Sequence, residues 1–280
     1  MNSVLEHPEA ARIERLSSRH ETPCGDGRMV WHVWGQGPPL VLLHGGFGSW
    51  LHWIRNVETL SRYFRVLAAD IPGLGESDEA PAVTPAGIGT VVAAGIESLV
   101  GQESVRLAGF SFGGLISGQV GLLLGQQVVG ITLIGASGMA LQRPPMELLR
   151  RHDDMDAQAR SAALRHNLNT LMLYHPDSID PLALYIQEWN DARARVRSRK
   201  MSLGDSLAEA MPLVQAKLSG IWGELDATAG SFLPEREALI RAAQPDAPFA
   251  VIQGAGHWVM YEGAEAFNRT LLEFVTGASD

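Results

Sequence analysis

The sequence predicts an α/β protein built on a mostly parallel β-sheet with helices on both faces. Short runs of apolar, β-prone residues alternate along the chain with longer segments in which apolar residues recur at three- and four-residue steps. The short runs are almost continuously apolar, as in parallel strands that are buried on both sides. The 280 residues are 46% apolar, which is enough to bury a full core. We therefore expect repeated β-α-β units.

The expected elements follow one another in regular order. In the first half of the chain we expect strands at residues 40–43, 65–69, 105–108 and 128–134, with helices at 50–63, 88–100 and 115–124 between them. In the last quarter we expect strands at 218–222 and 249–252, a helix at 234–243 between them, and a closing helix at 262–274.

Residues 137–206 interrupt this alternation. The segment is rich in Arg, Asp, Leu and Met, has helical spacing and contains no convincing strand. Prolines at 144, 145, 176 and 181 predict breaks between short helices. We therefore expect an α/β core of residues 1–136 and 207–280, with a helical insertion at 137–206.

Charge and composition argue against several kinds of binding partner and site. The 22 basic and 31 acidic residues leave a net charge of −9, which argues against a nucleic acid or an acidic membrane as partner. The single cysteine, Cys24, can form neither an internal disulfide nor a multi-thiolate zinc site. No secretory signal or membrane-spanning run is visible, so we expect a cytoplasmic protein that acts on a small molecule. A homo-oligomer stays possible.

The segment 109–113, Gly-Phe-Ser-Phe-Gly, fits G-x-S-x-G and lies between a predicted strand and a predicted helix. A serine at such a sharp turn sits in a strained backbone, and side chains at the two flanking glycines would collide with neighbouring elements. The Oγ atom of Ser111 would then project from the sheet, with the helix N-terminus behind it. These features predict a nucleophilic serine.

A serine hydroxyl needs a general base and a group that orients the base. Of nine histidines, His257 is the best candidate because it lies in a Gly-rich turn after a late strand. Asp226, in the turn after residues 218–222, is the expected orienting acid, and Glu224 is the alternative. The order Ser111, Asp226, His257 matches the Ser…Asp…His order of this architecture.

The glycine-rich segment 44–48 is expected to supply oxyanion donors. The N–H groups of Gly46 and Phe112 would form the two-donor hole, with Phe47 as the fallback donor. A phosphate loop is excluded because no lysine follows at the required spacing. We expect His44 to hold the loop structurally. The chemistry requires no metal and no cofactor.

Five segments together resemble the α/β-hydrolase superfamily, in its serine-nucleophile branch. They are HGGFGSW at 44–50, DIPGLGES at 70–77, GFSFGG at 109–114, WGELD at 222–226 and GAGHW at 254–258. The resemblance implies an eight-stranded, mostly parallel sheet with a helical cap inserted after the sixth strand. It also places Asp70 in a family loop motif, where we expect it to stabilise the turn.

The resemblance leaves the subfamily open. A serine at the elbow is unlike epoxide hydrolases and haloalkane dehalogenases, which use aspartate there. The segment 257–262 is similar to the end of meta-cleavage-product hydrolases, which cut carbon–carbon bonds in 2-hydroxy-6-oxo-dienoates. That subfamily typically has an Asn before the serine, whereas this chain has Phe110. The elbow is also similar to carboxylesterases, lactonases and perhydrolases.

The sequence predicts a serine hydrolase that cleaves a small ester or lactone through an acyl-enzyme. The alternatives are a C–C hydrolase, an acyltransferase or perhydrolase, and a small-molecule binder without turnover. Arg193 and Arg197 belong to a charged stripe, expected on a cap helix, that could anchor a substrate carboxylate or simply face solvent. Trp189 and Trp258 could wall an apolar pocket, together with Tyr185 and Met172, or pack in the core.

Overall fold

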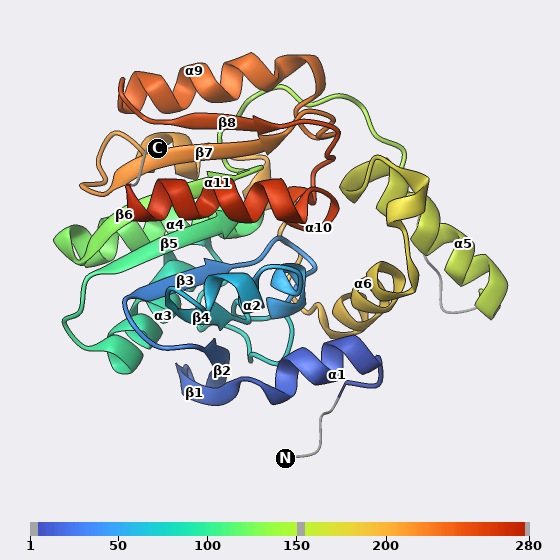
Figure 1. Ribbon diagram of the computed structural model, residues 1–280, viewed down its shortest axis with the longest axis horizontal. Coiled ribbons are helices and arrows are strands. Elements are labelled where there is room, and N and C mark those ends of the chain that lie inside the picture. The colour runs from blue at the N-terminus through green and yellow to red at the C-terminus, as the bar shows by residue number, and fades with distance from the viewer. Residues whose placement is uncertain (1–4, 150–154, 278–280) are drawn as a thin grey trace.

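The computed structural model describes residues 5–149 and 155–277 and contains one eight-stranded sheet (Figure 1). The strands lie in the order β1-β2-β4-β3-β5-β6-β7-β8, and all neighbours from β4 to β8 are parallel. The predicted α/β fold with a mostly parallel sheet of eight strands is thus confirmed. The strands are β1 (Ser18–Cys24), β2 (Gly27–Trp34), β3 (Pro39–Leu43), β4 (Arg65–Ala69), β5 (Val105–Phe110), β6 (Val128–Ile134), β7 (Lys217–Gly223) and β8 (Phe249–Ile252).

The first two strands form an antiparallel hairpin that the apolar pattern did not reveal. Five of the seven residues of β1 are exposed, so this edge strand lacks the apolar run of a buried strand. His20 is part of β1. Strand β2 then pairs antiparallel with β4 and joins the hairpin to the parallel sheet.

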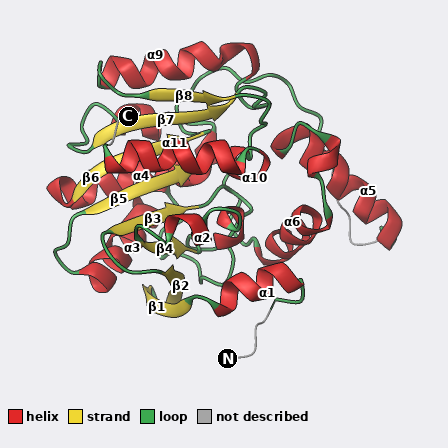
Figure 2. Cartoon of the chain, in the orientation of Figure 1, coloured by secondary structure: helices red, strands yellow, loops and turns green. Residues whose placement is uncertain are grey.

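Alternate residues of the central strands enter two separate cores, one on each face of the sheet. Leu40 and Leu42 of β3 pack with α2 and the C-terminal helix, whereas Val41 and Leu43 pack on the opposite face with α3 and α4. Figure 2 shows the resulting layers, with helices on both sides of the strands. The helices are α1 (Pro8–Arg15), α2 (Val57–Leu60), α3 (Pro85–Val100), α4 (Phe112–Leu124), α5 (Ala157–Asn167), α6 (Pro181–Arg193), α7 (Arg199–Ser202), α8 (Ser206–Ala210), α9 (Leu233–Ala243), α10 (Val259–Glu262) and α11 (Ala264–Thr276).

Two predicted helices are interrupted. The expected helix at 50–63 is a 3-10 turn, η1 (Trp50–Trp53), followed by the short α2. The expected closing helix at 262–274 is divided into α10 and α11 at Gly263, whose carbonyl accepts the Phe267 N–H. None of the helices in the described ranges is long and apolar enough to cross a membrane.

The segment between β6 and β7 carries α5 to α8, and α5 and α6 lie beyond the carboxyl ends of the strands (Figure 1). Asp180 joins α6 to the core, because its carboxylate accepts the hydroxyl of Tyr261 at 2.6 Å and pairs with Arg55 at 2.6 Å. The same carboxylate caps α6 by accepting the N–H of Ala183. Prolines 176 and 181 each stand at the start of a helix, as expected of breaks between short helices.

Candidate active site

Ser111 stands at the sharp turn between β5 and α4. Its backbone has φ 49° and ψ −110°, a strained conformation for a residue with a side chain. A Cβ on Gly113 would lie less than 3.0 Å from the Leu43 carbonyl, and one on Gly109 would lie less than 3.0 Å from the Ser117 hydroxyl. Both flanking glycines are therefore required by close packing of the turn against β3 and α4.

The structure brings Ser111, His257 and Asp226 together. The Nε2 atom of His257 lies 3.1 Å from Ser111 Oγ, and its Nδ1 atom lies 2.8 Å from Asp226 Oδ2. Because a carboxylate only accepts, Nδ1 carries the proton and Nε2 is left to accept the serine proton. This is the arrangement that activates a serine hydroxyl for attack on a carbonyl. Glu224, the alternative acid, accepts the N–H of Gly254 and holds the neighbouring turn.

Asp226 is fully enclosed and held by Thr228, a contact that the sequence did not suggest. One carboxylate oxygen accepts both the backbone N–H and the hydroxyl of Thr228, each at 2.7 Å. Burial raises the pKa of the Asp226 carboxyl, but the His257 ring and the Thr228 donors outweigh burial and leave this pKa below its usual range. The acid therefore stays ionised and fixes the imidazole.

The buried Arg236 supports the same turn. Its guanidinium donates to the carbonyls of Thr228 and Phe232, and also to that of Gln142 in the segment that follows β6. Arg236 is 5% exposed, so these bonds are shielded from water. No local motif predicted this role, because Arg236 lies in α9 and the residues it joins are distant in sequence.

The residues predicted to form the oxyanion hole lie close together. Phe112 is the first residue of α4, so its N–H has no partner within the helix. A Cβ on Gly46 would lie 3.8 Å from Phe112 Cβ and less than 3.0 Å from Ser198 Oγ. The cap residue Ser198 therefore covers this loop, a contact that the sequence did not suggest. Phe47, the fallback donor, has φ 50° and a side chain that is 39% exposed.

Two buried residues hold the loops around the hole. His44 accepts the N–H of Ile71 on Nε2 and contacts its own loop through Gly45, and burial lowers the pKa of His44 to about 4. Asp70 accepts the N–H groups of Trp50 and Glu76, and burial raises its pKa to about 6. The structural roles expected for both residues fit these contacts.

Glu262 fastens the histidine loop to the cap, another role that the sequence did not suggest. Its carboxylate accepts three backbone N–H groups, from Tyr174 at 3.0 Å, His175 at 2.8 Å and Gly256 at 2.6 Å. Gly256 directly precedes His257. The position of the candidate base thus depends on a carboxylate in α10.

The predicted pocket residues differ in their burial and contacts. Trp258 is completely buried, donates its indole N–H to His52 and stacks on Tyr261, so it packs in the core. Trp189 is 8% exposed and carries the guanidinium of Arg193 over its ring at 4.0 Å. Arg197 is exposed.

The charged stripe is not one helical face either, because α6 ends at Arg193 and α7 begins only at Arg199. The expectation of a stripe along a cap helix is therefore wrong. Arg195, in the stretch between the two helices, instead donates to the carbonyl of Ser77 in the core.

Comparison with known proteins agrees with this architecture. The sequence model of the Alpha/beta hydrolase family matches residues 40–270. The chain is 26% identical to a 2-hydroxy-6-oxononadienedioate/2-hydroxy-6-oxononatrienedioate hydrolase of Comamonas testosteroni over 86% of this chain and 88% of that protein. It is 38% identical to a pimeloyl-[acyl-carrier protein] methyl ester esterase of Vibrio campbellii, but this match covers only 41% of this chain and 43% of that protein.

Solved structures extend the likeness to the whole fold. A crystal structure of a meta-cleavage product hydrolase superposes with a TM-score of 0.73 at 20% sequence identity, and the match covers 92% of this chain and 98% of that chain. The family match spans all five sequence segments that carry the resemblance, from the glycine-rich loop after β3 to the histidine turn after β8. The chain therefore belongs to the α/β hydrolase family.

Proposed function

We propose that the protein is a serine hydrolase that cleaves a small carboxylic ester or lactone through an acyl-enzyme. The observation that carries the proposal is the continuous chain of contacts from Ser111 Oγ through His257 to Asp226. In this mechanism Ser111 attacks the carbonyl carbon while His257 takes its proton. The backbone N–H groups of Gly46 and Phe112 stabilise the oxyanion. His257 then protonates the leaving alcohol, and water resolves the acyl-enzyme.

The surroundings of the triad favour an ester over a dicarboxylate or dienoate substrate. Phe110 packs its ring 4.9 Å from the imidazole of His257 and offers no polar contact. A substrate carboxylate calls for a nearby cation, preferably an arginine that binds it with two hydrogen bonds. The arginines of the predicted stripe instead contact Trp189 or Ser77, or are exposed.

A C–C hydrolase is the second candidate. It is favoured by the Comamonas testosteroni relative, whose name specifies a 2-hydroxy-6-oxo-dienedioate and whose match covers most of both chains. The esterase relative of Vibrio campbellii matches under half of this chain. The same serine and histidine would serve either reaction, so the two candidates differ in what binds the rest of the substrate.

The test compares hydrolysis of p-nitrophenyl butyrate with that of a 2-hydroxy-6-oxo-dienoate, with Ser111→Ala as the blank. We expect turnover of the ester, labelling by a fluorophosphonate probe, and loss of both in the variant by about 10⁴-fold or more. Preference for the dienoate would replace the ester proposal with C–C hydrolysis. Absence of both turnover and labelling would indicate a binding protein, and added alcohol acceptors would reveal acyl transfer.

A further inference from the structure

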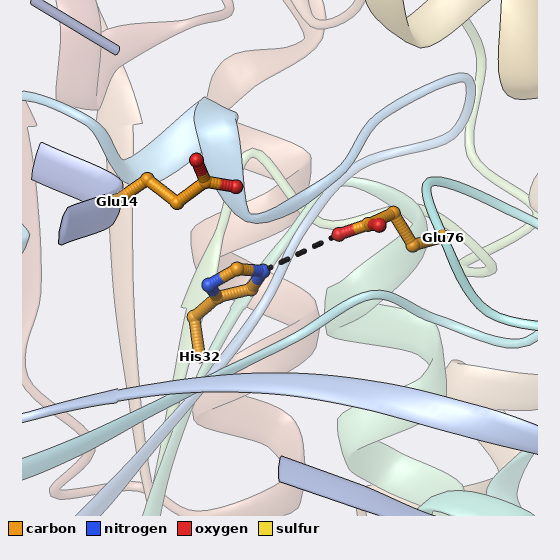
Figure 3. Close-up of side chains that lie close together, drawn as sticks. All are labelled: Glu14, His32 and Glu76. Atoms are coloured by element: carbon orange, nitrogen blue, oxygen red, sulfur yellow. Dashed lines mark ion pairs between the residues drawn. The ribbon is translucent and has the colours of Figure 1, made fainter. Parts of the chain in front are cut away.

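Outside the candidate active site, three side chains from distant segments converge on one point. They are Glu14 at the end of α1, His32 in β2 and Glu76 in the loop after β4, and Figure 3 shows them facing one another. One ligand-type atom from each residue lies within 4.8 Å of the other two. The His32 side chain is 1% exposed, and both glutamates are half-buried.

The hydrogen bonds of His32 decide which ring nitrogen is available. Ser17 Oγ donates its only proton to the carbonyl of Glu14 at 2.7 Å, so at its 3.1 Å contact with His32 Nδ1 it must accept. Nδ1 therefore carries the proton, and in the neutral ring Nε2 presents a lone pair. Among the residues that the structure describes, this buried Nε2 atom has no hydrogen-bond partner.

The lone pair points at negative charge. Glu76 Oε2 is 3.7 Å from Nε2, an ion-pair distance when the ring is protonated but beyond hydrogen-bond distance, and a Glu14 carboxylate oxygen lies within the same group (Figure 3). Arg19 reaches Glu76 at 3.8 Å and also pairs with Glu21. A metal cation between the ring nitrogen and the carboxylate oxygens would satisfy this lone pair.

We infer that Glu14, His32 and Glu76 form a binding site for a divalent transition metal of the zinc type. An imidazole nitrogen and two carboxylate oxygens are ligands that Zn²⁺ accepts in a four-coordinate site, whereas Ca²⁺ and Mg²⁺ require all-oxygen shells. Tetrahedral ligand atoms lie about 3.4 Å apart. The contact to Glu76, at 3.7 Å, is already near this value, and the Glu14 oxygen lies within 4.8 Å of the other two ligand atoms.

The surroundings fit a structural role for this site. Ser17 holds the tautomer that metal binding needs, as outer-shell partners of metal-bound histidines do. The ion would fasten α1 to the sheet. Helix α1 in turn adjoins the cap, because the backbone N–H of Glu6, just before it, donates to the Tyr185 hydroxyl. The inference does not depend on the proposed hydrolase activity, since none of the three ligands belongs to the triad.

The test uses the tag-free chain after treatment with a chelator. Isothermal titration with ZnCl₂ should show one equivalent bound, and CoCl₂ should give the visible absorption of a low-coordinate nitrogen and oxygen site. Zinc at a hundred times its Kd should raise the melting temperature by about 5 °C. The isosteric variants Glu14→Gln and Glu76→Gln should each weaken zinc binding by about tenfold to a hundredfold.

Matched controls separate this site from exposed side chains. Glu9→Gln, on the exposed side of α1, and His20→Gln, on the exposed strand β1, should bind zinc like the wild type. His32→Gln is a weaker test, because the ring packs against Trp34 and Trp50 and its loss could unfold the chain. The inference is overturned if no zinc binds, if binding survives both glutamate variants unchanged, or if Mg²⁺ or Ca²⁺ stabilises the protein equally.

Discussion

Replacing Glu262 by Gln tests whether the histidine loop is held from the cap side. One oxygen of the carboxylate accepts the N–H groups of Tyr174 and Gly256, and the other accepts that of His175. The amide oxygen of Gln can keep two of these bonds at most, and these become neutral and weaker. Its NH₂ group would face the third N–H, so that two donors oppose each other.

The magnitude follows from these three bonds. A hydrogen bond to a charged acceptor contributes about 2 kcal/mol, roughly twice as much as a neutral one. Loss of one bond, about 2 kcal/mol, and weakening of two by about 1 kcal/mol each should lower the free energy of unfolding by about 4 kcal/mol. Because Gly256 adjoins His257, a shift of this loop by about 1 Å should also lower kcat/KM by up to about 100-fold.

The assay combines urea unfolding, followed by tryptophan fluorescence, with the hydrolysis of p-nitrophenyl butyrate. The control is Glu265→Gln, an exposed glutamate three residues later in α11, which should change neither quantity. The reasoning is refuted if Glu262→Gln stays within 0.5 kcal/mol, the usual range of surface substitutions. Retention of full activity despite a large loss of stability would refute only the link to His257.

Three further predictions concern single residues. Burial raises the pKa of Asp70 from 3.8 to about 6, so the folded state keeps a proton that the unfolded chain loses in this window, and stability falls as the pH rises. As the pH rises from 3.5 to 6.5, the free energy of unfolding of wild type should therefore fall by about 3 kcal/mol relative to that of Asp70→Asn, measured by urea unfolding. A difference between the two proteins that does not change with pH would contradict this. Gly113→Ala places a Cβ against the carbonyl of Leu43 and should unfold or strongly destabilise the chain. Gly130→Ala should be tolerated, because the atom nearest to its added Cβ would be 3.7 Å away. Thermal melts followed by circular dichroism compare the two variants. Thr228→Val removes the hydroxyl bond to Asp226 and should lower kcat about tenfold with little change in KM, and unchanged steady-state kinetics would argue against a positioning role.

Local sequence pattern was sufficient for most of the sheet and for the choice of three candidate triad residues that the structure brings together. The strands β3 to β6 are short apolar runs between turn residues, and an unbroken apolar run indicates a strand that is buried on both faces. Ser111 is marked by flanking glycines that the turn requires, and His257 and Asp226 by their places after late strands. Strand β1 was missed because an exposed edge strand carries no apolar run.

Tertiary structure alone decided which distant side chains meet. Thr228 and Glu262 hold the triad through hydrogen bonds to residues that no local motif marks, and Ser198 covers Gly46 from the cap. Arg195 contacts Ser77 in the core whereas Arg197 is exposed, because the chain between α6 and α7 is not helical. Periodicity encodes which side of an element is buried, whereas the partner across a contact depends on how the elements pack. The sequence therefore determined the fold class and the candidate triad, and packing decided what positions and surrounds them.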